Sequence, residues 1–139
     1  MGWNDDLIAD YRANGKATKG PFVGRPVLIL TTTGAKSGGA HTIPLVFTTE
    51  GDDYVVVASK GGAPTSPDWF HNLMANPTVT VELGKEKFQA HATPASPDSE
   101  RERLYEAHAT VHPGFRDYLK KTTRKIPVVR LKRIPPAAA

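Results

Sequence analysis

The residues from Leu28 to Leu45 read LILTTTGAKSGGAHTIPL. An apolar run, a glycine-rich segment with one lysine and a second apolar segment predict a strand, a loop and a strand. Glycines let the backbone fold closely around a charge, so such a loop can point several N–H groups at an anion. Lys36 adds a positive charge, and the hydroxyls of Thr33 and Ser37 can donate to phosphate oxygens. The loop is therefore a candidate phosphate site, with an ordinary hairpin loop as the alternative.

A second segment of the same type follows a predicted strand over Asp53–Ala58, where residues 59–62 read SKGG. Two loops of this kind at strand ends suggest that one phosphate-bearing ligand is held between them. Downstream, Trp69 lies on a predicted short helix, and its ring can flank a planar ligand or pack in the core. Asn72 lies three residues later on the same helix face and can hydrogen-bond that ligand. The pattern predicts a planar, phosphorylated ligand.

Length and composition limit the classes of protein that fit. The chain has 139 residues, of which 39% are hydrophobic, and this predicts one globular domain with a buried core. No apolar run approaches the roughly 20 residues of a membrane span, and residues 1–11 do not resemble a secretion signal. Cysteine is absent, which excludes disulfides, thiolate catalysis and cysteine-bound metals. We therefore expect a cytoplasmic protein; one with peripheral membrane association would have the same composition.

The charge balance favours anionic partners. The formal net charge is +4 and the pI is about 9.4, values that suit an acidic cofactor, acidic lipid or nucleic acid. Basic residues gather in the C-terminal third, where a solvated basic face accounts for them. No nucleic-acid-binding module accompanies this charge, so we do not expect nucleic acid as a partner.

The periodicity of apolar residues predicts a mainly β chain with flanking helices. Strands are expected over residues 26–33, 42–50, 53–58, 78–83, 87–93 and 126–131. Helices are expected over residues 3–14, 67–75 and 115–122, with one more starting at residues 96–98. Strands joined by hairpins, with few helices between them, indicate an antiparallel barrel with the helices on its outside. We expect a single domain over residues 1–139, with an N-terminal helix and arm over 1–24 and a flexible tail over 133–139.

The same patterns predict two details of the helices. Ser66 is expected to cap the helix that follows it, with Pro67 at the first helical position. In the next helix, Leu104, Ala107 and Val111 are expected to form the buried stripe.

The chain contains no residue set with an evident chemistry of its own. Ala35, not glycine, precedes Lys36, and a strand follows the loop, which excludes a P-loop. Neither a nucleophile elbow nor paired catalytic carboxylates are present. His108 and His112 lie four residues apart but lack an acidic partner for zinc, so we expect exposed histidines and no metal. When anion-binding loops occur without a nucleophile, an organic cofactor can carry the reaction.

Four segments taken together resemble a known family. They read LTTTGAKSG from residue 30, TIPL from residue 42, VASKGGA from residue 57 and PDWFHNLMANP from residue 67. In this order and spacing they resemble the deazaflavin (F420)-dependent nitroreductase family of split β-barrel oxidoreductases, over about Val23 to Leu131. The resemblance implies an antiparallel split β-barrel and hydride transfer from reduced coenzyme F420 to an apolar acceptor such as a quinone or a nitroaromatic compound.

The resemblance also implies the residues of the site. The residues expected to contact the phosphate or the ring of the cofactor, or to close over it, are Ala35, Lys36, Ser37, His41, Thr42, Ile43, Pro44, Leu45, Val57, Ala58, Ser59, Lys60, Gly61, Asp68, Trp69 and Asn72. The acceptor pocket would involve His112, Phe115 and Tyr118, with Tyr118 as a candidate for orienting or protonating the acceptor and packing as its alternative role. Family members usually carry arginine at the position of Ala35 and often at that of His41, which leaves Lys36 and Lys60 as the main positive contacts.

Two alternative functions stay open from the sequence. One is a non-catalytic deazaflavin-binding or carrier protein, and the other is an oxidoreductase that uses FMN, as related split barrels do. The expected partner is a small apolar acceptor, and the chain would act as a monomer or a homodimer.

Overall fold

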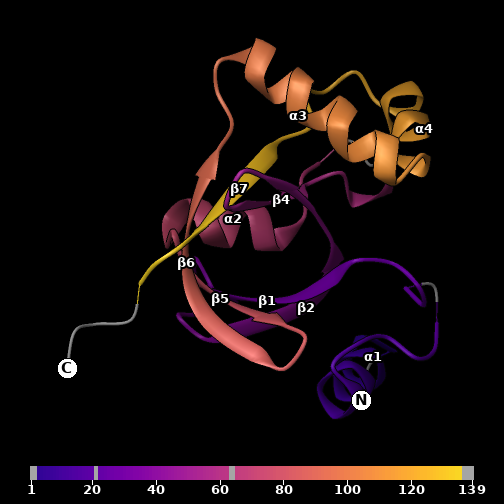
Figure 1. The fold of residues 1–139 in the computed structure, drawn as a ribbon. Helices are drawn as coiled ribbons and strands as arrows, with labels where there is room; N and C mark the ends of the chain where they lie inside the picture. Colours follow the sequence, from indigo (N-terminus) through magenta and orange to yellow (C-terminus); the bar gives the residue numbers. More distant parts are fainter. Residues whose placement is uncertain (1–2, 21, 63–64, 136–139) are drawn as a thin grey trace.

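A computed structural model describes residues 3–20, 22–62 and 65–135, and places seven strands in one antiparallel sheet. The sheet order is β2-β1-β5-β6-β7-β4-β3. The strands are β1 Val27–Thr33, β2 Ala40–Val46, β3 Thr48–Glu50, β4 Asp53–Val57, β5 Thr78–Leu83, β6 Glu86–Pro94 and β7 Val128–Arg133. The helices are α1 Trp3–Asn14, α2 Asp68–Ala75, α3 Asp98–Val111 and α4 Gly114–Lys121, with a single 3₁₀ turn, η1, at Lys60–Gly62. The expected antiparallel split barrel is confirmed as a curled half-barrel (Figure 1). The expectation that the helices lie outside the barrel is wrong for α2, because Trp69 and Leu73 pack with inward-facing strand residues in the main core cluster, within the curl of the sheet.

The curl follows from the break between β2 and β3. These two strands are neighbours in the sequence, yet they form the opposite edges of the sheet. At the break, the Phe47 amide donates to the Pro26 carbonyl at 3.1 Å. The predicted single strand over 42–50 is therefore wrong: the chain leaves one edge at Val46 and enters the other at Thr48, because the two edges of a curled sheet approach each other.

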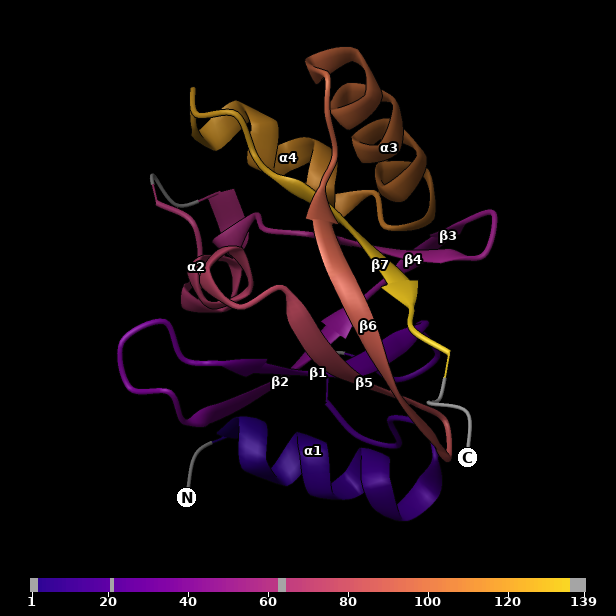
Figure 2. The same ribbon diagram turned by 90° about the vertical axis from the view of Figure 1, so that its left-hand side faces the viewer.

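β1 is buried on both faces, as its continuous apolar run predicts. Leu28 and Leu30 pack on the same side as Trp69 and Leu73 of α2. Val27 and Ile29 point to the other side, where they form a second cluster with Ile8 and Tyr11 of α1. Figure 2 shows the result: α1 lies below β1 and β2, and α2 lies above them beside the curled sheet.

The N-terminal helix is joined to the sheet by polar contacts as well as by its apolar face. The Tyr11 hydroxyl donates to the Val27 carbonyl and accepts from the Gly84 amide, both at 2.8 Å. Arg12 makes two hydrogen bonds to Glu82 of β5, at 2.9 and 2.7 Å.

In the part of the chain that the structure describes, no helix has the length and apolar character needed to cross a membrane.

Two helix details differ from the expectation. Pro67, not Ser66, is the N-cap of α2, and the Ser66 hydroxyl instead accepts a hydrogen bond from Arg124 at 3.2 Å. The buried face of α3 consists of Leu104, Tyr105, His108 and Ala109, whereas Ala107 and Val111 are exposed. The prediction is confirmed for Leu104 and wrong for Ala107 and Val111, because it treated polar His108, which lies on the buried face, as a solvent-facing residue.

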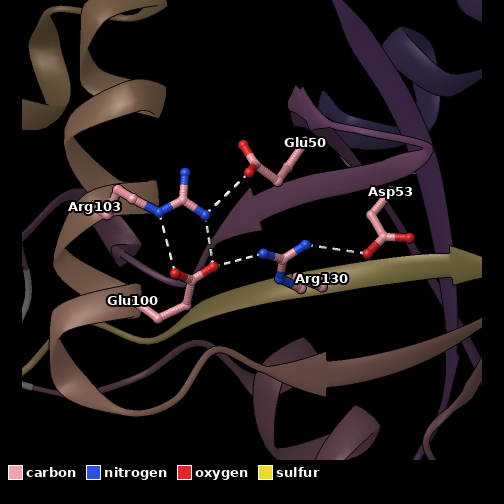
Figure 3. A network of polar contacts seen from close by, with 5 residues as sticks. All are labelled: Glu50, Asp53, Glu100, Arg103 and Arg130. Carbon is pink, nitrogen blue, oxygen red and sulfur yellow. Dashed lines mark hydrogen bonds and ion pairs between the residues drawn. The ribbon is translucent and has the colours of Figure 1, made fainter.

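An ion-pair network fastens α3 to the sheet (Figure 3). Glu100 accepts from Arg103 at 2.7 Å and from Arg130 of β7 at 2.5 Å. Arg103 also contacts Glu50 at 3.0 Å, and Arg130 contacts Asp53 at 3.2 Å. Hydrogen bonds from Arg103 and then from Arg130 lower the pKa of Glu100 to about 2. The network joins the first turn of α3 to the β3–β4 hairpin and to β7.

Candidate functional site

A groove runs between β2 and α2 and consists of two adjoining pockets. The Trp69 pocket, of about 260 Å³, is lined by His41, Thr42, Ile43, Lys60, Pro67, Asp68, Trp69 and Asn72. The Lys36 pocket, of about 540 Å³, is lined by Gly34, Ala35, Lys36, Ser37, His41, Asp68, His71 and Asn72. His41, Asp68 and Asn72 line both pockets, so the two form one groove. The structure thus brings the predicted phosphate loop and the predicted aromatic wall together.

The glycine-rich loop closes on itself more than its sequence suggests. Four of its backbone N–H groups donate within the protein, those of Gly34, Ala35, Gly38 and Gly39. Among the described residues, nothing accepts from the amides of Lys36 and Ser37. The prediction that several glycine amides face an anion is therefore corrected to two amides at the tip of the loop, because the hairpin itself uses the others.

The absence of a side chain at Gly34 allows Ser37 and His41 to pack closely at the polar end of the groove. A Cβ at this position would lie 2.5 Å from Ser37 Oγ and 2.7 Å from His41 Nε2, so a larger residue would displace both side chains. Ser37 Oγ and His41 Nε2 themselves lie 3.3 Å apart. Together with Lys36, this arrangement collects hydroxyl, imidazole and ammonium groups at one end of the groove, which is the donor set that an anion requires.

The other end of the groove is formed by Trp69 and Ile43. Trp69 is 6% exposed and belongs to the main core cluster while it also lines the pocket, so the two roles expected for it coincide. Ile43 is half-buried on the inward face of β2. Asn72 contributes to the walls through its amide: Oδ1 accepts from the Ala35 amide at 3.0 Å, and Nδ2 donates to Thr32 Oγ1 at 3.2 Å.

Not every predicted cofactor residue lies on the wall of this groove. Those that line neither pocket are Pro44, Leu45, Val57, Ala58 and Ser59. All three of Val57, Ala58 and Ser59 are buried; Val57 is the last residue of β4, and Ala58 and Ser59 follow it. Gly61 lies in η1.

The η1 turn places Lys60 at the Trp69 pocket in an unusual backbone conformation. Lys60 has φ +48°, the left-handed region that costs a residue with a Cβ roughly 1–2 kcal/mol. Its Nζ lies 3.5 Å from Thr65 Oγ1. Gly62 closes the turn with φ +83°, and a Cβ there would lie 2.9 Å from the Lys121 side chain and 3.3 Å from Tyr118 Cα. The turn therefore rests directly on α4.

The predicted acceptor residues form an aromatic cluster next to this turn. The Phe115 ring centre lies 5.0 Å from that of Tyr118 and 6.1 Å from that of His112. The Tyr105 hydroxyl donates to the Phe115 carbonyl at 2.5 Å and fixes the start of α4. None of these residues lines either pocket of the groove. The backbone of Tyr118 packs on Gly62, in the same η1 turn as Lys60, which lines the Trp69 pocket.

The expectation that His108 and His112 are exposed is wrong. They are 0% and 1% exposed, and their ring centres lie 4.9 Å apart. His108 Nδ1 lies 3.2 Å from Thr48 Oγ1, and His112 Nε2 donates to the Phe47 carbonyl at 3.2 Å. Burial lowers the pKa of both imidazoles, that of His108 to about 3. They anchor α3 at the β2–β3 break, and the described residues contain no group of three or more metal-ligating side chains.

Sequence reasoning missed the role of Arg124, which it assigned to a solvated basic face. Its guanidinium donates to the carbonyls of Ala58 and Ser59, at 3.1 and 2.8 Å, behind the groove. These contacts join residues that lie 66 and 65 positions apart in the sequence, so no local pattern points to them.

Comparisons with known proteins point to one family and one fold. A family model described as F420H(2)-dependent quinone reductase matches residues 5–133. An F420H(2)-dependent quinone reductase of Mycobacterium tuberculosis is 43% identical over 110 residues, which are 78% of this chain and 74% of that protein. A solved F420-H2 dependent reductase, FDR-A, is 38% identical with a TM-score of 0.70, covering 78% of this chain and 95% of that one. The heme storage protein HutZ of Vibrio cholerae, 18% identical with a TM-score of 0.61 over 95% of this chain and 91% of that one, shares the fold.

Proposed function

The chain belongs to the F420H(2)-dependent quinone reductase family, and from this premise we propose that coenzyme F420 binds in the groove between β2 and α2. The protein is an oxidoreductase that uses F420 and reduces a quinone. Its family membership favours a quinone over a nitroaromatic acceptor, the two expected from the sequence. The observation that carries the proposal is the continuity of the groove, because one ligand can reach both pockets.

The residues of the groove fit the chemistry of this coenzyme. Coenzyme F420 combines a planar ring with a phosphate and an acidic glutamate tail. The Lys36 pocket would supply the donors for the acidic part: the Lys36 ammonium, the Ser37 hydroxyl, His41 and the backbone amides of Lys36 and Ser37. The Trp69 pocket supplies apolar walls for the ring, with Lys60 at its rim.

The protein contributes orientation and a water-poor site rather than a nucleophile. When bound, reduced F420 supplies a hydride for the acceptor. Trp69 and Ile43 would pack against the ring and exclude water, and Lys36 and Lys60 would hold the anionic groups. Positioning of two reactants in this way can account for a large part of a rate enhancement. Tyr118 would orient the quinone or donate a proton to its oxygen, and Phe115, whose ring centre lies 5.0 Å from that of Tyr118, would hold Tyr118 in place.

Fluorescence titration of the purified protein tests the proposal, with oxidised F420 and, separately, with FMN. We expect saturable binding of F420, and weakening of that binding by about tenfold in Lys36→Ala, which removes one charge-assisted contact. Lys132→Ala, an exposed lysine on β7, is the matched control. Binding of FMN alone would reassign the cofactor. Binding of F420 without turnover of any quinone would favour the carrier alternative.

Peripheral membrane association is a further part of the proposal, because an apolar quinone partitions into membranes. The net charge of +4 favours an anionic lipid surface. Co-sedimentation with vesicles of anionic lipid is the measurement, and recovery of all the protein in the supernatant at low salt would contradict membrane association.

The oligomeric state is a separate question. Size-exclusion chromatography distinguishes the monomer from the homodimer.

A further inference from the structure

One side chain outside the groove holds both ends of the segment that carries Lys60. Arg124 Nη2 donates to the carbonyls of Ala58 and Ser59, at 3.1 and 2.8 Å, where β4 ends. Arg124 Nη1 donates to Ser66 Oγ at 3.2 Å, one residue before the N-cap of α2. A single guanidinium therefore joins the residues before η1 to the residue that leads into α2.

The carbonyls that Arg124 binds need such a donor. Ala58 is fully buried and Ser59 is 6% exposed, so water satisfies their backbone oxygens poorly. The segment that carries Arg124 runs beside them, because the Ala58 amide donates to the Pro127 carbonyl at 2.9 Å. The Arg124 amide in turn donates to Thr122 Oγ1 at 3.2 Å, which fixes the approach of the arginine.

Between the two contact points lies the strained residue of the site. Lys60 has φ +48° and lines the Trp69 pocket. A strained backbone conformation persists only where contacts with the surrounding structure hold it in place. The Ser59 carbonyl, which accepts from Arg124, also accepts from the Gly62 amide at 3.0 Å and so closes the turn around Lys60.

We infer that Arg124 is a positioning residue for cofactor binding: by holding the carbonyls of Ala58 and Ser59 and the hydroxyl of Ser66, it fixes the turn that presents Lys60 to the groove. The inference rests on the proposed function, because it takes the groove as the F420 site. Arginine suits this role because its planar fork reaches several acceptors at once, which lysine cannot do.

The test compares Arg124→Lys with Arg101→Lys. Arg101 is the matched control, since it is also partly buried and donates to a backbone carbonyl, that of Ile126 at 3.2 Å, away from the groove. We expect Arg124→Lys to raise the Kd and the KM for F420 about tenfold, because lysine cannot reach both the two carbonyls, which Nη2 binds, and the Ser66 hydroxyl, which Nη1 binds. The kcat at saturating F420 should change far less. Hydrogen exchange of the Gly62 amide in the free protein should accelerate in Arg124→Lys and not in Arg101→Lys.

The possible outcomes separate this inference from the proposed function. Wild-type protein that binds no F420 would overturn the proposed function and the inference with it. Wild-type binding with an unchanged Kd and unchanged Gly62 exchange in Arg124→Lys would overturn the inference alone. Equal losses in Arg124→Lys and Arg101→Lys would also overturn it, as general destabilisation. If Arg124→Lys does not fold, Ser66→Ala removes one acceptor at a partly exposed position and should raise the Kd by about threefold; an unchanged Kd would overturn the inference.

Discussion

The side-chain oxygen of Asn72 accepts a hydrogen bond from the backbone amide of Ala35 at 3.0 Å, so α2 and the glycine-rich loop are joined across the candidate cofactor groove. The nitrogen of the same side chain donates to Thr32 Oγ1 at 3.2 Å. One amide thus fixes the distance between the two walls of the Lys36 pocket. Asn72 was expected to bind the ligand, and in the structure its first role is to shape the groove.

Replacement of Asn72 should affect both stability and cofactor binding. Asn72→Ala removes the partner of the buried Thr32 hydroxyl and the acceptor of the partly buried Ala35 amide contact, which costs about 1–3 kcal/mol of unfolding free energy. The loop also loses its link to α2, so the Kd for F420 should rise. Urea unfolding and fluorescence titration measure the two effects.

Asn76→Ala is the control for this change, because Asn76 Nδ2 also joins α2 to β1, at the Thr33 carbonyl, but is exposed. It should cost less than 1 kcal/mol, about the net value of one exposed hydrogen bond, and leave F420 affinity intact. Equal effects of the two substitutions would contradict a special role for Asn72.

Substitutions of Lys60 can separate backbone strain from charge. Glycine adopts positive φ without a steric cost, so Lys60→Gly should be more stable than Lys60→Ala by about 1 kcal/mol. Both variants lose the ammonium at the rim of the Trp69 pocket, and both should bind F420 about tenfold more weakly. Thermal unfolding and titration are the measurements. Wild-type affinity in Lys60→Ala would remove Lys60 from the site.

The elements that local patterns determine could be predicted from the sequence. The apolar run of β1 predicts a strand buried on both faces, and the strand expected over residues 78–83 is β5, Thr78–Leu83. The two Gly/Lys/Ser segments were placed at strand ends, and Lys36 and Lys60 do line one groove. In each case, the signal lies within a few residues of the position that it describes.

The remaining features depend on partners far along the chain. His112 is buried because its ring reaches the Phe47 carbonyl, 65 positions away in the sequence. Phe47 itself lies at the break between β2 and β3, which exists because the sheet curls and brings its two edges together. The amides of the glycine-rich loop are used by the hairpin and by Asn72, which composition cannot reveal. Arg124 looked like a surface charge for the same reason. Local sequence thus located the groove but not the contacts that shape it.

The role of Tyr118 can be tested through its hydroxyl. Tyr118→Phe keeps the ring that packs on Phe115 and removes the group that would orient or protonate the quinone. We expect kcat with a quinone to fall by about 100-fold, the lower end of the effect of a proton donor, with an unchanged KM for F420. Tyr105→Phe is the control, because it removes a hydroxyl that serves the Phe115 carbonyl. An unaltered kcat in Tyr118→Phe would leave packing as the role of Tyr118.

The buried histidine pair should make the fold sensitive to mild acid. Burial lowers the pKa of His108 to about 3 and also lowers that of His112, both from 6.5, so the unfolded chain binds protons that the folded protein does not. Stability from the pair is therefore complete above pH 6.5 and is lost as the pH falls below it. Each histidine can contribute a slope of up to about 1.4 kcal/mol per pH unit in this range.

Urea unfolding between about pH 7 and about pH 5 isolates this effect, because carboxyl groups titrate mainly below that range. Glu100, for example, has its pKa lowered from 4.5 to about 2. His108→Asn keeps a hydrogen-bonding group near Thr48 and does not titrate, so its stability should fall less steeply with acid than that of the wild type. His71→Asn, at an exposed position, should keep the wild-type slope. Equal stability of the wild type at both ends of the range would show that the pair is protonated within the fold at little cost, contrary to its burial against Phe115.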